Sequence, residues 1–117
     1  MPARALPQHT DRPGTDELVM RYRLAGRGLA PVEAIVPCAT TDPEVFHPEH
    51  QSGVRVAPYK AEKLALAVCE DCPLMTACLV SDMRGAASVF NVRGVRAGLR
   101  QSERRALYLA LDREGLL

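Results

Sequence analysis

Apolar residues recur at the spacing of an α-helix in several stretches, and no stretch alternates long enough with the period of a β-strand. The first stretch predicts a helix over residues 16–27, where Leu18, Val19 and Tyr22 share one face. Three further helices are predicted at 58–68, 73–84 and 102–114, the last one capped by Ser102. The pattern therefore predicts a small all-α domain of about four helices.

Proline and glycine mark where these helices begin and end. Pro58 and Pro73 suit the first turn of a helix, because an amide in that turn has no intrahelical partner. Gly94 and Gly98 stand four residues apart between the third and fourth helices. Glycine accepts a positive φ angle without strain, so these two residues predict a tight turn over residues 94–98, which we name the glycine turn.

The amino-terminal region differs from the rest in composition. Residues 1–14 contain three prolines and a glycine and are expected to form a disordered arm. The chain is therefore expected to divide into a partly disordered arm with one helix, residues 1–31, and a main domain, residues 32–117. Early in the main domain, Pro43 and Pro48 predict an irregular segment in which one helical turn is allowed.

Composition limits what this chain can be. It has 117 residues, no Trp and only 4% aromatic residues, which indicates one domain with a modest core. A metal centre would then contribute directly to the free energy of folding. No apolar run reaches membrane-spanning length and the first residues do not resemble a signal peptide. We expect a cytoplasmic protein, with no membrane partner, whose thiols stay reduced.

Charge is unevenly distributed although the net charge is only +1. From Arg84 to Arg105 there are six arginines against one acid, Glu103. Such a basic segment is typical of proteins that bind nucleic acid or an acidic partner. It is equally typical of an ordinary solvated helix face, so charge alone leaves both interpretations open.

The four cysteines form the most specific motif in the chain. Cys38, Cys69, Cys72 and Cys78 follow the pattern C-x30-C-x2-C-x5-C, with no cysteine left over. A helix that begins at Pro73 would bring Cys78 near the other two clustered thiols. Its amino terminus would favour thiolates, the form of cysteine that binds metal.

Four interpretations of these cysteines compete. A 4Fe–4S cluster takes four thiolates and tolerates irregular spacing. A structural zinc ion also takes four thiolates, but usually from two closely spaced pairs, whereas this chain has one pair and two single cysteines. Two disulfides are disfavoured in a reducing compartment. Four cysteines that merely pack in the core are disfavoured by their crowding beside Glu70 and Asp71. The spacing therefore favours iron–sulfur over zinc.

Taken together, these motifs resemble the WhiB-like family of actinobacterial transcription regulators. The resemblance covers about residues 35–108. The matching features are Cys38 with Asp42-Pro43-x-x-Phe46-x-Pro48, then Cys69-x2-Cys72-Pro73-x4-Cys78, Gly94-Val95-x-x-Gly98-Leu99, and Ser102-Glu103-Arg104-Arg105. The family commonly carries Trp in its turn, where this chain has Arg96.

The resemblance implies a helical fold around a 4Fe–4S cluster that the four cysteines hold and that responds to oxygen or nitric oxide. It also implies binding to the carboxyl-terminal domain of the primary sigma factor, within the RNA polymerase holoenzyme, and action at promoter DNA. The residues expected to meet the sigma factor are Phe46, Pro48, Gly94, Val95, Arg96 and Gly98. Those expected to contact DNA in the basic carboxyl-terminal helix and just before it are Arg100, Arg104 and Arg105.

The expected function is that of a non-enzymatic, redox-sensing transcription regulator. Two alternatives remain from other classes. The first is a protein disulfide reductase that uses the Cys69 and Cys72 pair, although the βαβ pattern typical of thioredoxin-like motifs is not visible in the sequence. The second is an interaction module stabilised by zinc.

Overall fold

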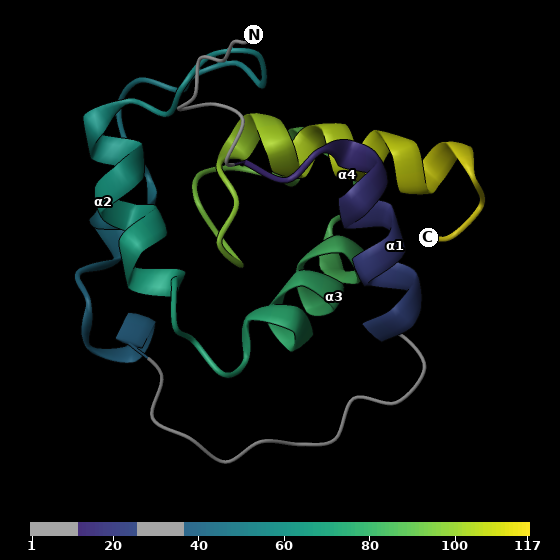
Figure 1. The fold of residues 1–117 in the computed structure, drawn as a ribbon, viewed down its shortest axis with the longest axis horizontal. Coiled ribbons are helices and arrows are strands. Elements are labelled where there is room, and N and C mark those ends of the chain that lie inside the picture. The colour runs from purple at the N-terminus through teal and green to yellow at the C-terminus, as the bar shows by residue number, and fades with distance from the viewer. Residues whose placement is uncertain (1–11, 26–36) are drawn as a thin grey trace, which may run out of the picture.

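A computed structural model of the protein describes residues 12–25 and 37–117, and within these ranges the chain is helical (Figure 1). The predicted all-α fold is confirmed. The only β pairing in the described ranges is a single bridge between Arg96 and Leu99. The elements are α1 (Thr15–Ala25), η2 (Pro37–Thr40), η3 (Pro43–Phe46), α2 (Lys60–Cys69), α3 (Met75–Gly85), η4 (Val89–Asn91) and α4 (Gln101–Arg113), where η denotes a short 3₁₀ helix. No described helix has the length and apolar character needed to cross a membrane.

Two helices begin later than their prolines predicted. Helix α2 begins at Lys60 and α3 at Met75, so placing Pro58 and Pro73 in first turns was wrong. Before α2, the amide of Tyr59 donates to the Glu62 carboxylate at 2.9 Å, and this contact starts the helix two residues after the proline. Before α3, Pro73 lies in a turn that the Met75 amide closes by donating to the Cys72 carbonyl at 3.2 Å.

The last helix also begins differently. Arg100, in an extended conformation, is the residue before α4, and its amide donates to Glu103 Oε1 at 3.0 Å. Glu103, the third residue of α4, thus accepts a hydrogen bond from a backbone amide that has no partner within the helix. Ser102 Oγ is buried without a hydrogen-bond partner in the described structure, so the prediction that Ser102 caps the helix was wrong.

The hydrophobic core lies among three of the four described helices. Helix α1 packs on α3 and α4, and Figure 1 shows these three gathered together while α2 stands apart. The glycine turn adds Ala97 to the core, and Leu99 follows directly after the turn. The core residues are Leu18, Val19, Tyr22, Leu79, Val80, Met83, Ala97, Leu99, Leu107, Ala110 and Leu111. Each fully buried leucine contributes roughly 1.5–3 kcal/mol, so this cluster is the main apolar stabilisation of the fold.

Helix α2 belongs to a second, smaller part of the molecule. It packs against η2 and η3, and its Ala65 is fully buried there. Polar contacts join this part to the three-helix core. The guanidinium of Arg100, which is 0% exposed, donates to Ser52 Oγ at 2.7 Å and to the carbonyls of Val56 at 2.7 Å and Val54 at 3.2 Å. A side chain from the start of α4 therefore anchors the loop that leads into α2.

Glu103 balances the charge of Arg100 and also anchors the amino-terminal segment. Its carboxylate lies 3.4 Å from Arg100 Nε, which makes no hydrogen bond of its own. Arg12 donates to the two oxygens of Glu103 at 2.6 and 2.9 Å, and to the Gly98 carbonyl at 2.9 Å. The predicted disordered arm therefore does not extend to Arg12. Residues 1–11 and the predicted boundary at residue 31 lie outside the described residues.

A second buried ion pair joins α3, α4 and the glycine turn. Arg104 is 3% exposed and donates to both carboxylate oxygens of Asp82, at 2.6 and 2.7 Å. Its remaining nitrogen donates to the carbonyl of Gly94 at 2.8 Å and to that of Arg93. The motif did not indicate this burial, because Asp82 and the turn carbonyls that bind Arg104 inside the molecule come from other segments.

Replacement of Arg104 by leucine should therefore be strongly destabilising. Arg104→Leu leaves the Asp82 carboxylate buried without a partner, which typically costs about 3–5 kcal/mol. The free energy of unfolding, measured by urea titration, should fall by that amount. The double variant Asp82→Leu/Arg104→Leu should recover part of the loss, because no unpaired charge remains.

Arg113→Ala is the matched control for this experiment. Arg113 is an exposed arginine at the end of the same helix, and its loss should change stability by no more than about 0.5 kcal/mol. An Arg104→Leu variant as stable as the Arg113→Ala variant would show that the buried pair does not stabilise the fold.

Candidate metal centre

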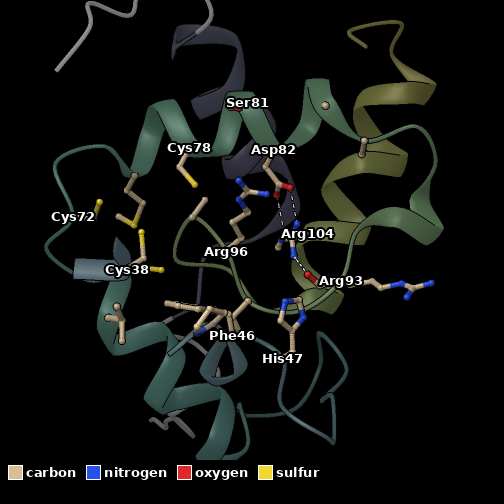
Figure 2. A pocket seen from close by; sticks show the side chains of 18 of the residues that line it. Cys38, Phe46, His47, Cys72, Cys78, Ser81, Asp82, Arg93, Arg96 and Arg104 are labelled. Atoms are coloured by element: carbon tan, nitrogen blue, oxygen red, sulfur yellow. Dashed lines mark hydrogen bonds and ion pairs between the residues drawn. The ribbon is translucent and has the colours of Figure 1, made fainter. Parts of the chain in front are cut away.

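The four cysteines come from different elements and meet at one cavity. Cys38 lies in η2, Cys69 ends α2, Cys72 lies in the turn that follows, and Cys78 lies in α3. All four line a cavity of about 760 Å³. Figure 2 shows Cys38, Cys72 and Cys78 gathered at one end of this cavity. Cys38 is exposed, the other three are half-buried, and all four are free thiols.

Local backbone turns bring three of these thiols together. The Cys72 amide donates to the Cys69 carbonyl at 3.1 Å, which reverses the chain directly after α2. After a second turn, in which the Met75 amide donates to the Cys72 carbonyl at 3.2 Å, the Cys78 amide donates to the Leu74 carbonyl at 2.8 Å and the chain continues as α3. The carboxyl end of one helix and the amino end of the next therefore face the same space.

The thiols influence one another electrostatically. Burial raises the pKa of Cys69, and a hydrogen bond from the Gly98 backbone lowers it in part. The charges of Cys78, Cys38 and Cys72 raise the same pKa further, in that order of importance. All three other sulfurs are therefore close enough to Cys69 to repel its thiolate, so a cationic centre among them would relieve this repulsion.

The donor set is compatible with an iron–sulfur cluster. Among the residues that the structure describes, no three His, Cys, Asp or Glu side chains converge closely enough to hold one metal ion. A zinc ion needs all four sulfurs at about 2.3 Å from one point. A 4Fe–4S cluster instead binds each thiolate to a different iron, so its ligands surround a larger volume. Four thiols around one cavity fit the second arrangement.

The glycine turn forms one wall of this cavity, with Val95, Arg96 and Ala97 among the lining residues. Gly94 and Gly98 have positive φ angles of 73° and 74°, as predicted. Ala97 also has a positive φ angle, 55°, which the sequence did not predict. The bridge between Arg96 and Leu99, with both N–H···O distances at 2.9 Å, closes the turn and explains why a non-glycine residue accepts this conformation.

Each glycine of the turn lies at a close contact, which is with backbone at Gly94 and with a side chain at Gly98. A Cβ atom on Gly94 would lie 2.2 Å from the Phe46 carbonyl oxygen, and that oxygen also accepts the Val95 amide at 2.7 Å. A Cβ atom on Gly98 would lie 2.5 Å from the sulfur of Met75. One end of the turn therefore rests on η3 and the other on the start of α3.

The predicted partner residues occupy different environments. Phe46 and Pro48 are half-buried, and Phe46 lines the cavity without joining the core. Gly94 and Val95 are buried. Arg96 is exposed at the mouth of the cavity.

The predicted DNA-contact residues are mostly turned inward. Arg100 and Arg104 are 0% and 3% exposed, and partners inside the chain bind both guanidinium groups. The phosphate contacts of these two arginines stay a prediction, and they would require both guanidinium groups to leave their partners inside the chain. Arg105 is half-buried and its Nε donates to the Val92 carbonyl at 2.8 Å.

Sequence reasoning missed Phe90. Its side chain is 72% exposed, more than any other large hydrophobic side chain in the described ranges, and it lies in η4, four residues before Gly94. Arg93 Nε donates to the Phe90 carbonyl at 3.2 Å and steadies this turn. The available signal was that Phe90 is one of only two phenylalanines in the chain, and the other is Phe46.

Gly94→Ala should destabilise the protein through both a steric clash and backbone strain. The clash partner is the Phe46 backbone oxygen, which cannot move aside without displacing η3. We expect Gly94→Ala to lower the free energy of unfolding by more than the roughly 1 kcal/mol of positive-φ strain alone. Thermal or urea unfolding measures the difference.

Gly115→Ala separates the two contributions. Gly115 also has a positive φ angle, 71°, but an added Cβ would meet nothing within 4 Å. This variant should show the strain without the clash. Equal losses in both variants would mean that the contact between the turn and Phe46 is not tight in solution.

The comparisons with known proteins agree with this architecture. The chain matches the family described as Transcription factor WhiB over residues 34–107, which is more than half of its length. The matched range contains all four cysteines and the glycine turn and ends within α4. No curated protein and no solved structure matches the chain. The resemblance seen in the sequence is confirmed, and the chain belongs to the WhiB family of transcription factors.

Proposed function

We propose that this transcription factor senses a small oxidant, oxygen or nitric oxide, through a 4Fe–4S cluster, and that it reports the state of the cluster to the primary sigma factor. The ligands would be Cys38, Cys69, Cys72 and Cys78. The observation that carries the proposal is that these four thiols line one cavity whose wall is the glycine turn. When bound, the cluster would supply an iron–sulfur centre that reacts with small oxidants.

A direct contact links the thiols to the turn. The backbone of Gly98 donates a hydrogen bond to Cys69, and Gly98 also packs closely on Met75 in the first turn of α3. A displacement of the Cys69 sulfur would remove this hydrogen bond. The other end of the turn, at Gly94 and Val95, is held by Arg104 and by the Phe46 carbonyl. A shift of the turn at Gly98 would therefore alter the surface that Phe46 and Arg96 share.

The proposed partner surface combines exposed and supporting residues. Phe46, Pro48 and Arg96 are accessible and would contact the carboxyl-terminal domain of the sigma factor. Gly94, Val95 and Gly98 would shape the turn rather than touch the partner, because the first two are buried and Gly98 packs on Met75. We add Phe90 to the contact residues, because an exposed aromatic side chain beside the turn can anchor an interface.

DNA contact is a lesser part of the proposal. Of the three arginines predicted for it, only Arg105 keeps a partly exposed side chain. A single phosphate contact contributes a modest, salt-screened amount to affinity. We therefore expect the sigma factor, and not this chain alone, to bring the protein to promoter DNA.

The two alternative functions are less well supported. A disulfide reductase needs a nucleophilic thiolate, but the pKa of Cys69 is raised by burial and by its neighbouring thiols. A single zinc ion needs ligands that converge on one point, and the described thiols surround a cavity instead. Membership of a transcription factor family also favours a regulator over an enzyme.

Replacement of any one of the four cysteines by serine should reduce the iron content of anaerobically purified protein and remove most of its visible absorbance. It should also lower the thermal stability, because metal binding and folding are coupled. Ser81→Ala is the matched control, since Ser81 lines the same cavity but offers no thiolate. A wild-type protein with stoichiometric zinc and no iron would rule out the cluster.

Phe90→Ala should weaken binding to the sigma-factor domain about tenfold or more, as expected for an aromatic anchor. The cluster spectrum and the fold should not change, because the side chain is largely exposed. Leu109→Ala is the control, since Leu109 is an exposed hydrophobic residue on α4, 50% accessible. Titration calorimetry with the isolated sigma domain measures both affinities. Equal affinities for the two variants would exclude Phe90 from the interface.

A further inference from the structure

Apart from its thiols, the cysteine cavity has an excess of positive charge. The charged residues that line it are Asp82, Arg93, Arg96 and Arg104. Asp82 and Arg104 neutralise each other, because both carboxylate oxygens accept hydrogen bonds from the guanidinium. Two cations, Arg93 and Arg96, remain without an acid to balance them within the lining.

The two remaining arginines are held differently. Arg93 Nε donates to the Phe90 carbonyl, and Figure 2 shows its side chain extending away from the cysteines. The Arg96 side chain makes no hydrogen bond or ion pair with any residue that the structure describes. Figure 2 shows it reaching into the cavity toward the wall formed by α3, where Cys78 and Asp82 lie.

The backbone of Arg96 is held firmly enough to place this charge. Its amide and carbonyl both bond to Leu99, and the turn is held at its two ends by the contacts of Gly94 and Gly98. Leu99 is itself a core residue, 2% exposed. The position of the Arg96 Cα is therefore set by the fold, although its side chain is exposed.

Charge complementarity indicates what Arg96 would face. Four thiolates bring four negative charges, and the oxidised 4Fe–4S core brings two positive ones, so the bound group is a dianion. An external one-electron donor adds a third negative charge on reduction, with no bond formed or broken. A nearby cation stabilises the reduced state more than the oxidised one, because its Coulomb energy grows with the charge that it faces.

We propose that Arg96 is the counter-charge of the cysteine-held cluster and raises its reduction potential. The inference rests on the proposed cluster but not on the sigma factor. It also gives a physical reason for a guanidinium without an acidic partner in this cavity: the thiolates offset its charge, so no acidic residue of this chain is required beside it.

The test is a redox titration of anaerobically prepared protein. Dithionite serves as the one-electron donor, and visible and electron paramagnetic resonance spectra follow the reduction. Arg96→Gln should shift the ratio of reduced to oxidised cluster about tenfold toward the oxidised form at a given potential, which is about 59 mV for one electron. Arg96→Lys keeps the charge and should retain most of the wild-type potential.

Two controls separate a specific charge effect from a general one. Arg93→Gln removes an exposed cation that lines the same cavity but points away from the thiols, so its shift should be clearly smaller. Raising the salt concentration should shrink the difference between wild type and Arg96→Gln, because exposed charges are screened. Iron content and circular dichroism verify that each variant is folded and loaded.

The outcomes distinguish this inference from the proposed function. Equal potentials for wild type and Arg96→Gln at low salt, with the cluster present in both, would overturn the role of Arg96 and leave the cluster in place. Equal shifts for Arg93→Gln and Arg96→Gln would also overturn the assignment to Arg96. A wild-type protein that forms no cluster would overturn the proposed function itself.

Discussion

The buried ion pair between Arg104 and Asp82 is the interaction on which the rest of the arrangement depends. It joins α4 to α3, and the same guanidinium holds the carbonyls at the start of the glycine turn. Two charges away from water are stable only when they are paired and their remaining donors are satisfied. The turn carbonyls accept those donors, so the position of the turn and the stability of the helix pair have a common origin.

The cysteine cavity lies between the two parts of the molecule. The part with α2, η2 and η3 supplies Cys38 and Cys69, and the three-helix core supplies Cys78. The loop before α2 is attached to the start of α4 through the hydrogen bond of Arg100 with Ser52. A centre bound by thiols from both parts would therefore act as a further link between them. Its loss would lower the stability of the fold as well as disrupt the site.

The arginines of this chain show how one residue type serves opposite purposes. Arg100 and Arg104 are enclosed by acids and carbonyls and stabilise the structure. Arg96 has no such enclosure and lines the cavity that the four thiols share, so its charge is available to a group bound there. A count of basic residues near the carboxyl end would treat all three as one nucleic-acid surface, although only burial decides which of them can meet a ligand.

Features that depend on local order follow from the sequence alone. Apolar spacing located four helices, Gly94 and Gly98 located a turn with positive φ angles, and the cysteine motif with its flanking residues identified the family. These properties follow from period, backbone freedom and spacing along the chain, which a single sequence contains.

Pairings between distant residues depend on the folded arrangement. Arg12 pairs with Glu103 across 91 positions, and Arg100 reaches Ser52 across 48, so no local pattern could show that these charges are buried. The exposure of Phe90 and the positive φ angle of Ala97 depend in the same way on what surrounds them. Burial and pairing are properties of the folded arrangement, because the free energy of a charge or an aromatic ring is set by its neighbours in space and not by its neighbours in sequence.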